Sequence, residues 1–316
     1  MKTELGAAAA LRRIALNEDI KAYILQHQPL YQTLLGAAMR FIGGETLAQC
    51  VEVAKSLTPQ GLASTIDYMG ESTRNASMAE QAKQEFLEVI QVIAKEDLDS
   101  SVSLDLSHIG MVVDAELGYK NAHVLAEATH KVGLEMMISM EGTDRTSLIL
   151  DIYRRLCEHF DNVGITLQAY LYRTPDDLRA VVKYSGKIRL VKGAFDVPKH
   201  LAVSRGAELD TAYCRLMESL LKAGHLCSIA THDESILNHA HEFIQERKIK
   251  QENVEFELLK GVTPNLLQNI HERGYRTRVY LPYGREWYLY LCNRLSEHTP
   301  NVYQAITDAV EHRHES

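Results

Sequence analysis

Hydrophobic residues recur at spacings of three and four through the first 60 residues. The recurring sets include Leu34, Leu35 and Ala38, followed by Leu47, Val51 and Ala54. This period predicts amphipathic helices, because residues three and four apart share one helix face. Gly43-Gly44 and Pro59 interrupt the pattern, and no convincing strand appears. We therefore expect residues 1–60 to form a helical arm.

After residue 60, short apolar runs alternate with longer amphipathic stretches. Eight such runs, each followed by a helical pattern within about 250 residues, are typical of a (β/α)8 TIM-type barrel. A doubly wound sheet is the alternative, but it would need a glycine-rich phosphate loop after its first strand, and "DYMGESTRN" lacks GxGxxG. We predict a barrel over residues 61–307 and a polar tail over 308–316. The runs are "LASTIDYMG" (62–70), "SVSLDLS" (101–107), "GLEMMISM" (133–140), "VGITLQAY" (163–170), "KIRLVKGA" (187–194), "HLCSIATH" (225–232), "VEFELLKG" (254–261) and "TRVYLPYG" (277–284).

Composition narrows the class of protein. The 316 residues are 46% hydrophobic and 24% charged, with a net charge of −8, and the pI is near 6.0. An acidic chain offers no basic face to nucleic acid, and no apolar run reaches the roughly 18 residues of a membrane-spanning helix. The five cysteines are scattered and never spaced as CxxC, which is typical of reduced thiols in a cytoplasmic protein.

If the chain forms a barrel, its chemistry belongs at the carboxyl ends of the strands. Three cations with one histidine at these ends, Arg189, Lys192 and Lys260 with His232, indicate phosphates or a carboxylate as ligand. For Arg189 or Lys192 alone, an ion pair with a neighbouring carboxylate is the favoured explanation. We expect no metal site, because His239 and His241 point to different helix faces. The polar residues at the strand ends are Asp105, Ser107, Ser139, Glu141, Gln168, Tyr170, Arg189, Lys192, Thr231, His232, Lys260, Tyr280 and Tyr283.

The helix predicted after the last strand carries a second candidate surface. Trp287, Tyr290 and Arg294 recur at spacings of three and four, which places an indole, a phenol and a guanidinium on one face. Such a face suits a small anionic molecule. An uncharged Asn293 stands directly before the arginine.

Five phrases, taken in order, resemble the proline dehydrogenase family. They are "LQAYLYRT" (167–174), "RLVKGAF" (189–195), "ATHD" (230–233), "FELLKGV" (256–262) and "RVYLPYGREWYLYLCNR" (278–294). The resemblance implies a (β/α)8 enzyme that uses FAD to oxidise L-proline to pyrroline-5-carboxylate, with its last helix over the barrel mouth. The positions that it implies for the flavin are Gln168, Arg189, Lys192, Gly193, Ala194, Thr231, His232 and Glu297.

On the substrate side the chain departs from the pattern that the resemblance implies. Family members hold the substrate carboxylate with two consecutive arginines and a lysine; here Asn293 and Asp105 replace the first arginine and the lysine. Ser139 stands where an aspartate is expected and Phe195 where a tyrosine is expected, whereas Tyr280, Tyr290 and Arg294 match. Losing one arm of a buried carboxylate clamp costs on the order of 2–5 kcal/mol.

We therefore expect a dehydrogenase that transfers hydride from a carbon next to an amine nitrogen to flavin N5, with an amino-acid-like substrate other than free L-proline. Arg189, Asp105 and Tyr280 are the expected catalytic residues. A quinone or oxygen would serve as electron acceptor. The alternatives are a genuine L-proline dehydrogenase and a flavin-binding homologue without activity. We expect a cytoplasmic location, with peripheral attachment to the inner membrane left open.

Overall fold

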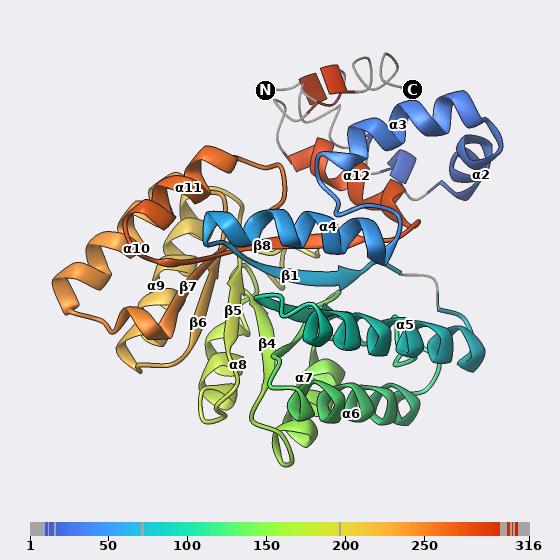
Figure 1. The fold of residues 1–316 in the computed structure, drawn as a ribbon. Coiled ribbons are helices and arrows are strands. Elements are labelled where there is room, and N and C mark those ends of the chain that lie inside the picture. Colours follow the sequence, from blue (N-terminus) through green and yellow to red (C-terminus); the bar gives the residue numbers. More distant parts are fainter. Residues whose placement is uncertain are drawn as a thin grey trace.

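The computed structural model describes residues 10–11, 13–15, 17–70, 73–195, 197–297, 302–303, 305 and 307–308. Eight parallel strands close into one barrel in sequence order, each beside the next and the last beside the first (Figure 1). The predicted barrel is confirmed, and every strand lies within or one residue beyond its predicted run. The strands are β1 (Ala63–Tyr68), β2 (Ser100–Leu104), β3 (Met136–Ile138), β4 (Val163–Gln168), β5 (Ile188–Val191), β6 (Cys227–Ala230), β7 (Val254–Leu259) and β8 (Arg276–Tyr283).

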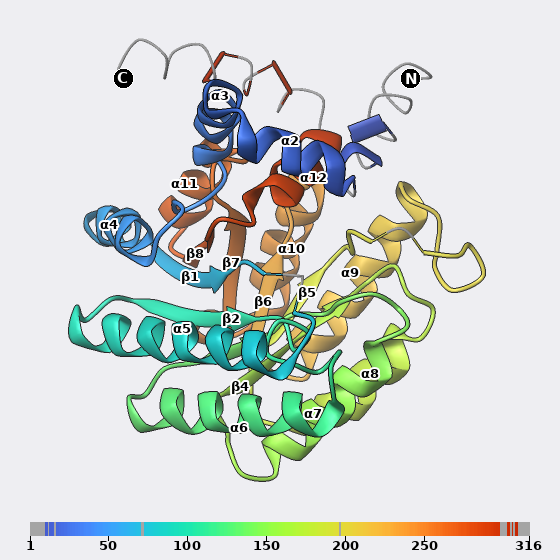
Figure 2. The ribbon, with the colours of Figure 1, turned by 90° about the vertical axis from the view of Figure 1, so that its right-hand side faces the viewer.

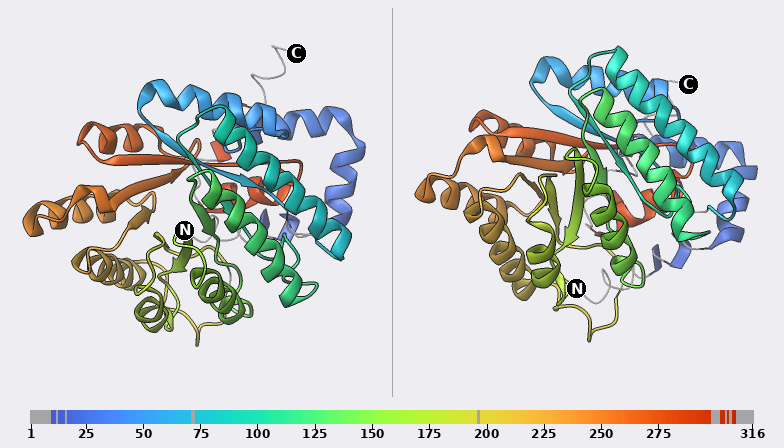
Figure 3. Two further views of the ribbon diagram at one scale, coloured as in Figure 1. Left: turned by 60° about the horizontal axis from the view of Figure 1, so that its bottom comes forward. Right: turned by 90° about the horizontal axis from the view of Figure 1, so that it is seen from below.

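Helices surround the strands (Figure 3). Asn75, Asp114 and Asp233 each cap the first turn of the helix that follows by accepting a hydrogen bond from a backbone N–H. No helix within the described ranges is long and apolar enough to cross a membrane. The helices that follow the first seven strands are α5 (Ala76–Lys95), α6 (Ala115–Lys131), α7 (Thr146–Cys157), α8 (Thr174–Val181), α9 (Ala207–Lys222), α10 (Glu234–Arg247) and α11 (Pro264–Glu272), with a short 3-10 turn, η2 (Gln251–Asn253), before β7.

The eighth helix leaves this ring. Helix α12 (Trp287–Glu297) packs against α3 (Gln28–Met39) of the arm, and both lie with α2 (Glu18–Gln26) at one end of the barrel (Figure 2). The vacant place outside β8 and β1 is taken by α4 (Leu47–Leu57), which is followed by the 3-10 turn η1 (Thr58–Gln60). A capping box between Thr46 and Gln49 starts α4. An arm helix thus completes the outer wall and frees α12 to cover the mouth.

Hydrogen bonds fasten the arm to the barrel. The backbone N–H of Gly43 donates to Pro282 at 2.8 Å, which extends the edge of β8 into the linker before α4. The Lys260 ammonium donates to the carbonyls of Met39 (2.6 Å) and Arg40 (3.1 Å) at the end of α3. Carbonyls at a helix C-terminus carry partial negative charge, so a buried ammonium satisfies them well.

The strands alternate in a way that is unusual for a parallel sheet. In β7, Phe256 and Leu258 belong to the apolar layer, whereas Glu255 and Glu257 bond to polar partners on other strands. Parallel strands are usually apolar on both faces. This barrel therefore has a charged interior inside an apolar shell of helices.

Glu255 is the centre of the lower charged layer. It is 3% exposed and lies 2.9 Å from the Lys187 ammonium and 3.1 Å from Arg278 Nε. Burial favours the neutral acid, but the charges of Arg278 and Lys187 outweigh that effect and lower the pKa of Glu255 to about 2. The carboxylate thus stays charged. It links Arg278 on β8 to Lys187, the residue directly before β5.

We predict that Glu255→Gln lowers the free energy of unfolding at pH 7 by about 3–5 kcal/mol, because it leaves the buried Arg278 without its carboxylate, whereas Lys187 keeps Glu135 at 3.0 Å. Chemical denaturation measures this. The matched control is Asp99→Asn, which breaks an exposed pair with Arg276 and should cost about 0–1 kcal/mol.

The difference in stability between wild type and Glu255→Gln should itself depend on pH. Because the pKa of Glu255 is depressed, its contribution is complete above the ordinary value of 4.5 and is lost as the pH falls towards about 2. The stability difference between wild type and Glu255→Gln should therefore shrink over that interval. A difference that stays constant would show that the carboxylate is not charged in the barrel.

Candidate active site

Arg189, on β5, is the fixed centre of the upper layer. The side chain is 5% exposed. Its Nε donates to Thr166 Oγ1 at 3.0 Å, and Nη2 donates to the hydroxyls of Ser103 (3.1 Å) and Ser139 (3.2 Å). With a bond from Nη1 to Glu257, four of the five guanidinium N–H groups have partners among the described residues. One N–H is left for a ligand.

The charge of Arg189 is balanced by Glu257 on β7. Arg189 Nη1 lies 3.3 Å from Glu257 Oε1, and this carboxylate also accepts hydrogen bonds from Thr65 (2.8 Å) and Ser228 (3.0 Å). Together with Thr166 and Ser103, which bond to Arg189, six strands (β1, β2, β4, β5, β6 and β7) therefore contribute to holding one ion pair. A buried guanidinium held in this way keeps one orientation, which is what an electrostatic role in catalysis requires.

Tyr280 and Asp67 extend this layer towards β8 and β1. The Arg189 guanidinium carbon lies 5.3 Å from the centre of the Tyr280 ring, and the Tyr280 hydroxyl donates to Asp67 Oδ2. Burial raises the pKa of Asp67 to about 6, and the hydrogen bond from Tyr280 and the charge of Arg189 limit the rise. Asp67 therefore titrates close to neutral pH.

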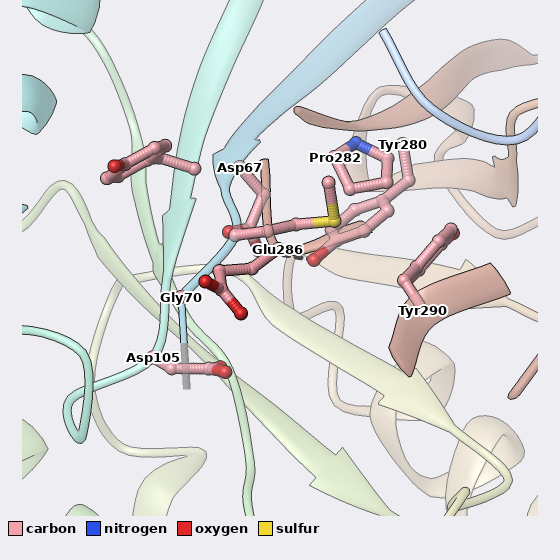
Figure 4. Close-up of a pocket in the computed structure, with 9 residues that line it drawn as sticks. Asp67, Gly70, Asp105, Tyr280, Pro282, Glu286 and Tyr290 are labelled. Atoms are coloured by element: carbon pink, nitrogen blue, oxygen red, sulfur yellow. Dashed lines mark hydrogen bonds between the residues drawn. The ribbon is translucent and has the colours of Figure 1, made fainter. Parts of the chain in front are cut away.

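A cavity of about 90 Å³ opens beside Asp67 and Tyr280 at the carboxyl ends of β1, β2 and β8. Figure 4 shows Asp67, Asp105 and Glu286 around one space, with Tyr280 and Tyr290 beside it. None of the described residues that line the cavity carries a positive charge. Its lining consists of Asp67, Tyr68, Met69, Gly70, Asp105, Tyr280, Pro282, Glu286 and Tyr290. An acidic cavity of this kind favours an ammonium and disfavours a carboxylate.

Three predicted site residues, Asp105, Tyr280 and Tyr290, line this cavity together. Sequence reasoning missed Asp67 and Glu286. Asp67 carries the same signal that identified Asp105, a carboxylate near the end of an otherwise apolar strand. Glu286 lies in the short connection between β8 and α12, where no periodic pattern could identify it.

Helix α12 does not present the single ligand-binding face that the spacing suggested. Trp287 is 1% exposed, and its indole N–H donates to Glu45 Oε1 at 3.2 Å and to the Tyr31 hydroxyl at 3.3 Å. The indole thus serves the contact with the arm, because α12 is packed between the arm and the mouth. Tyr290 alone of the three lines the cavity.

The two residues of the altered clamp lie one turn further along α12. Arg294 is 8% exposed, and its guanidinium carbon lies 5.0 Å from the centre of the Tyr290 ring. Asn293 is half-buried, and neither residue is part of the cavity lining. Ser139 lies at the end of β3, where its hydroxyl accepts from Arg189 and is 3.2 Å from the Ser103 hydroxyl.

The predicted phosphate-binding residues form a separate group at the ends of β5 and β6. Lys192 Nζ lies 2.6 Å from Asp210 and 2.7 Å from Asp233. These are ion pairs with neighbouring carboxylates, which is the explanation that the sequence favoured for this lysine taken by itself. His232 Nε2 accepts from the backbone N–H of Leu259 at 3.2 Å, which ties the ends of β6 and β7 together. Thr231 is buried, and its hydroxyl accepts from the Asp233 N–H at 3.2 Å.

The segment after β5 begins with Gly193 at φ +107°. A Cβ at this position would lie 2.2 Å from the Tyr170 ring, so only glycine fits. Ala194 and Phe195 follow on the surface, and Phe195 is 46% exposed. Phe195 therefore does not join the cavity in this structure. Glu297 ends α12, and its side chain lies outside the described part, as do residues 309–316 of the tail.

A flavin fits the donors and acceptors at the mouth. Gln168 is 2% exposed at the end of β4, and its Nε2 donates to the carbonyls of Met140 (3.1 Å) and Glu141 (3.0 Å). Its buried Oε1 has no hydrogen-bond partner among the described residues. An orphaned buried acceptor calls for a donor, and the isoalloxazine ring offers its N3–H. The unused N–H of Arg189 is a matching donor for the ring's nitrogens.

Comparison with known proteins shows which family this chain resembles. A family model described as proline dehydrogenase matches residues 50–305. Proline dehydrogenase 1 of Bacillus subtilis (strain 168) is 33% identical over 292 residues, which are 92% of this chain and 96% of that protein. The proline dehydrogenase of Deinococcus radiodurans is 32% identical over 276 residues, 86% and 89% of the two chains.

Among solved structures, proline utilization A of Bdellovibrio bacteriovorus superposes with a TM-score of 0.80 at 21% identity. The match covers 94% of this chain but 37% of that longer protein, and it shows the shared fold. With the family model matching most of the barrel and two relatives above 30% identity, this chain belongs to the proline dehydrogenase family.

Proposed function

We propose that this protein is an FAD-dependent dehydrogenase that removes hydride from a carbon next to an amine nitrogen, and that its substrate is not free L-proline. The family consists of flavin-dependent oxidoreductases that act on CH–NH donors. The observation that carries the proposal is the lining of the cavity, in which Asp67, Asp105 and Glu286 contribute three carboxylates.

The cofactor would be held from the strand ends. Gln168 Oε1 would accept from the ring, Arg189 would donate to it, and the group around Lys192, Gly193, Ala194, Thr231 and His232, with Glu297, would hold the remainder of the FAD. When bound, the flavin supplies a hydride acceptor at N5 and passes the electrons to an external acceptor such as a quinone or oxygen. Arg189 would stabilise the negative charge of the reduced ring, which is the usual task of a fixed cation at such a site.

The substrate side selects against a carboxylate. A carboxylate in the cavity would lie beside Asp67 and Asp105, while Glu286 is paired with Lys21, and such juxtaposition of like charges costs several kcal/mol. An ammonium or N–H group in the same place is attracted to Asp105 and Asp67. Tyr280 and Tyr290 bound the pocket, Ser139 shapes its Arg189 side, and the Arg294 guanidinium lies over the Tyr290 ring. We therefore favour an amine that carries positive charge where proline carries its carboxylate.

Genuine L-proline dehydrogenase activity is the second candidate. It is favoured by the relatives of 32–33% identity, whose names are proline dehydrogenase, and by the retained Tyr280, Tyr290 and Arg294. A flavin-binding homologue without activity is the third. The three candidates differ in which amine, if any, reduces the bound flavin.

We predict that the purified protein binds FAD and that Gln168→Ala weakens this binding about five- to tenfold, because one hydrogen bond to the ring is lost. Quenching of flavin fluorescence on titration measures the affinity. Gln91→Ala on the exposed face of α5 is the matched control and should bind as wild type does. A protein that takes up no FAD would contradict the assignment of the cofactor.

A panel of three amines tests the substrate class. The panel consists of L-proline, pyrrolidine, which lacks the carboxylate, and 2-(aminomethyl)pyrrolidine, which replaces the carboxylate with a second ammonium. We predict that anaerobic bleaching of the flavin is fastest with 2-(aminomethyl)pyrrolidine and at least about tenfold slower with L-proline, since each 1.4 kcal/mol of charge repulsion is a factor of ten.

The other outcomes have equally definite meanings. If L-proline bleaches the flavin fastest and pyrroline-5-carboxylate forms, the protein is a proline dehydrogenase and the proposed substrate class is wrong. If FAD is bound but no amine bleaches it, the homologue without activity is supported.

Restoring the clamp gives an independent test. We predict that the triple variant Asp105→Lys, Ser139→Asp and Asn293→Arg gains at least about 100-fold in the kcat/KM for L-proline, because a completed carboxylate clamp is worth on the order of 2–5 kcal/mol. Stopped-flow measurement of flavin reduction reports the gain. No gain in a variant that still binds FAD would mean that the pocket differs by more than its charges.

A further inference from the structure

Dehydrogenation of an amine needs a group that removes a proton as well as a group that accepts hydride. A C–H bond next to nitrogen can leave as hydride only when the nitrogen lone pair is available to form the C=N bond. At neutral pH an alkylamine is protonated, with a pKa near the roughly 10.4 of lysine, and its lone pair is engaged. Some group in the pocket must therefore take the proton from nitrogen.

We propose that the Asp67 carboxylate is that proton acceptor and is therefore a catalytic residue of this site; the inference rests on the proposed function. Asp67 lines the cavity, and it is held in place because Oδ2 accepts the hydrogen bond of Tyr280. Tyr280 in turn lies over Arg189. The proton acceptor, Asp67, is thereby fixed beside Tyr280, which lies next to Arg189, the residue that would contact the flavin.

The other two carboxylates of the cavity are placed less well for this task. Glu286 is 44% exposed and forms an ion pair with Lys21 of the arm. Asp105 is half-buried in the connection that follows β2, where its charge also acts on the Arg145 guanidinium. Asp67 is 7% exposed and is the carboxylate that bonds to Tyr280. Depth and fixed orientation both favour Asp67.

The protonation state of Asp67 suits the role. Burial raises its pKa to about 6 while Tyr280 and Arg189 limit the rise, so the group is mostly ionised at pH 7 yet a better base than an exposed aspartate. The charged and titratable groups that surround Asp67 are Arg189 on β5, Glu257 on β7, Tyr280 on β8, Tyr68 on β1, Asp105 after β2, Glu286 before α12 and Tyr290 on α12.

The step balances. A secondary ammonium, R₂NH₂⁺, gives one proton to Asp67, which becomes the neutral acid. The electron pair of the adjacent C–H bond leaves with its hydrogen as hydride to the oxidised flavin, and the nitrogen lone pair forms the C=N bond of an iminium ion. The product keeps one positive charge, and Asp67 returns its proton to solvent before the next turnover.

The test compares wild type, Asp67→Asn and Tyr280→Phe in anaerobic flavin reduction by pyrrolidine and by 2-(aminomethyl)pyrrolidine between pH 5 and 10. In wild type the rate should rise as Asp67 ionises, through a pH near 6. In Asp67→Asn the rate at pH 7 should fall about 10²–10⁴-fold and recover only as the amine itself loses its proton. Tyr280→Phe removes a hydrogen bond that lowers the pKa of Asp67, so in this variant the rate should rise at a higher pH than in wild type.

Asp99→Asn, the same substitution in an exposed pair, is the control and should keep the wild-type profile. FAD affinity, measured for every variant, reports folding and shows whether the site is intact. If Asp67→Asn keeps the wild-type rise and Tyr280→Phe does not move it, the assignment of Asp67 is wrong while the proposed function stands. If neither amine reduces the wild-type flavin, the proposed function fails, and the proton transfer with it.

Discussion

The structure depends on pairing charges inside a closed barrel. A buried cation without a carboxylate costs several kcal/mol, and this interior holds Arg278, Lys187 and Arg189. Strand β7 supplies a carboxylate to all three: Glu255, in the lower layer, pairs with Lys187 and Arg278, and Glu257, in the upper layer, pairs with Arg189. Because the side chains of a strand alternate, both glutamates point inward while Phe256 and Leu258 join the apolar shell. The barrel that closes around these pairs also fixes Arg189 in the orientation that the site needs.

This constraint explains what could be predicted from the sequence. Strands such as 254–259 and 276–283 were predicted because a short apolar run and the alternation of side chains along a strand are both visible in the local sequence. Asp105 and Tyr280 were found because strand ends meet at one mouth, and Tyr290 was found from the resemblance of the helix that follows the last strand to the family. The partners of Lys192 were not found, because Asp210 and Asp233 lie on two helices whose approach depends on the closed fold. Trp287 was assigned to the wrong surface because helical spacing cannot say which neighbour a face meets.

The departures from the family pattern are compatible with an intact cofactor side. Arg189 takes its counter-charge from Glu257 at 3.3 Å, so the serine at 139 costs it no essential ion pair. The Ser139 hydroxyl still accepts a bond from Nη2. Replacing lysine by Asp105 makes the substrate side more negative by two charges and replacing arginine by Asn293 by one more, whereas replacing aspartate by Ser139 returns one. The flavin side and the substrate side are therefore electrically separable, and one can change while the other stays.

The acidity of the pocket also involves the arm. Glu286 is paired with Lys21 of α2, so one of the three carboxylates already has its cation, supplied from outside the barrel. The other two, Asp67 and Asp105, line the cavity, and the charge of each raises the pKa of the Tyr280 hydroxyl. A ligand that carries positive charge is attracted to these carboxylates, whereas one that carries a carboxylate is repelled by them. The electrostatic preference of the cavity thus follows from a lining that holds three carboxylates and no cation among the described residues.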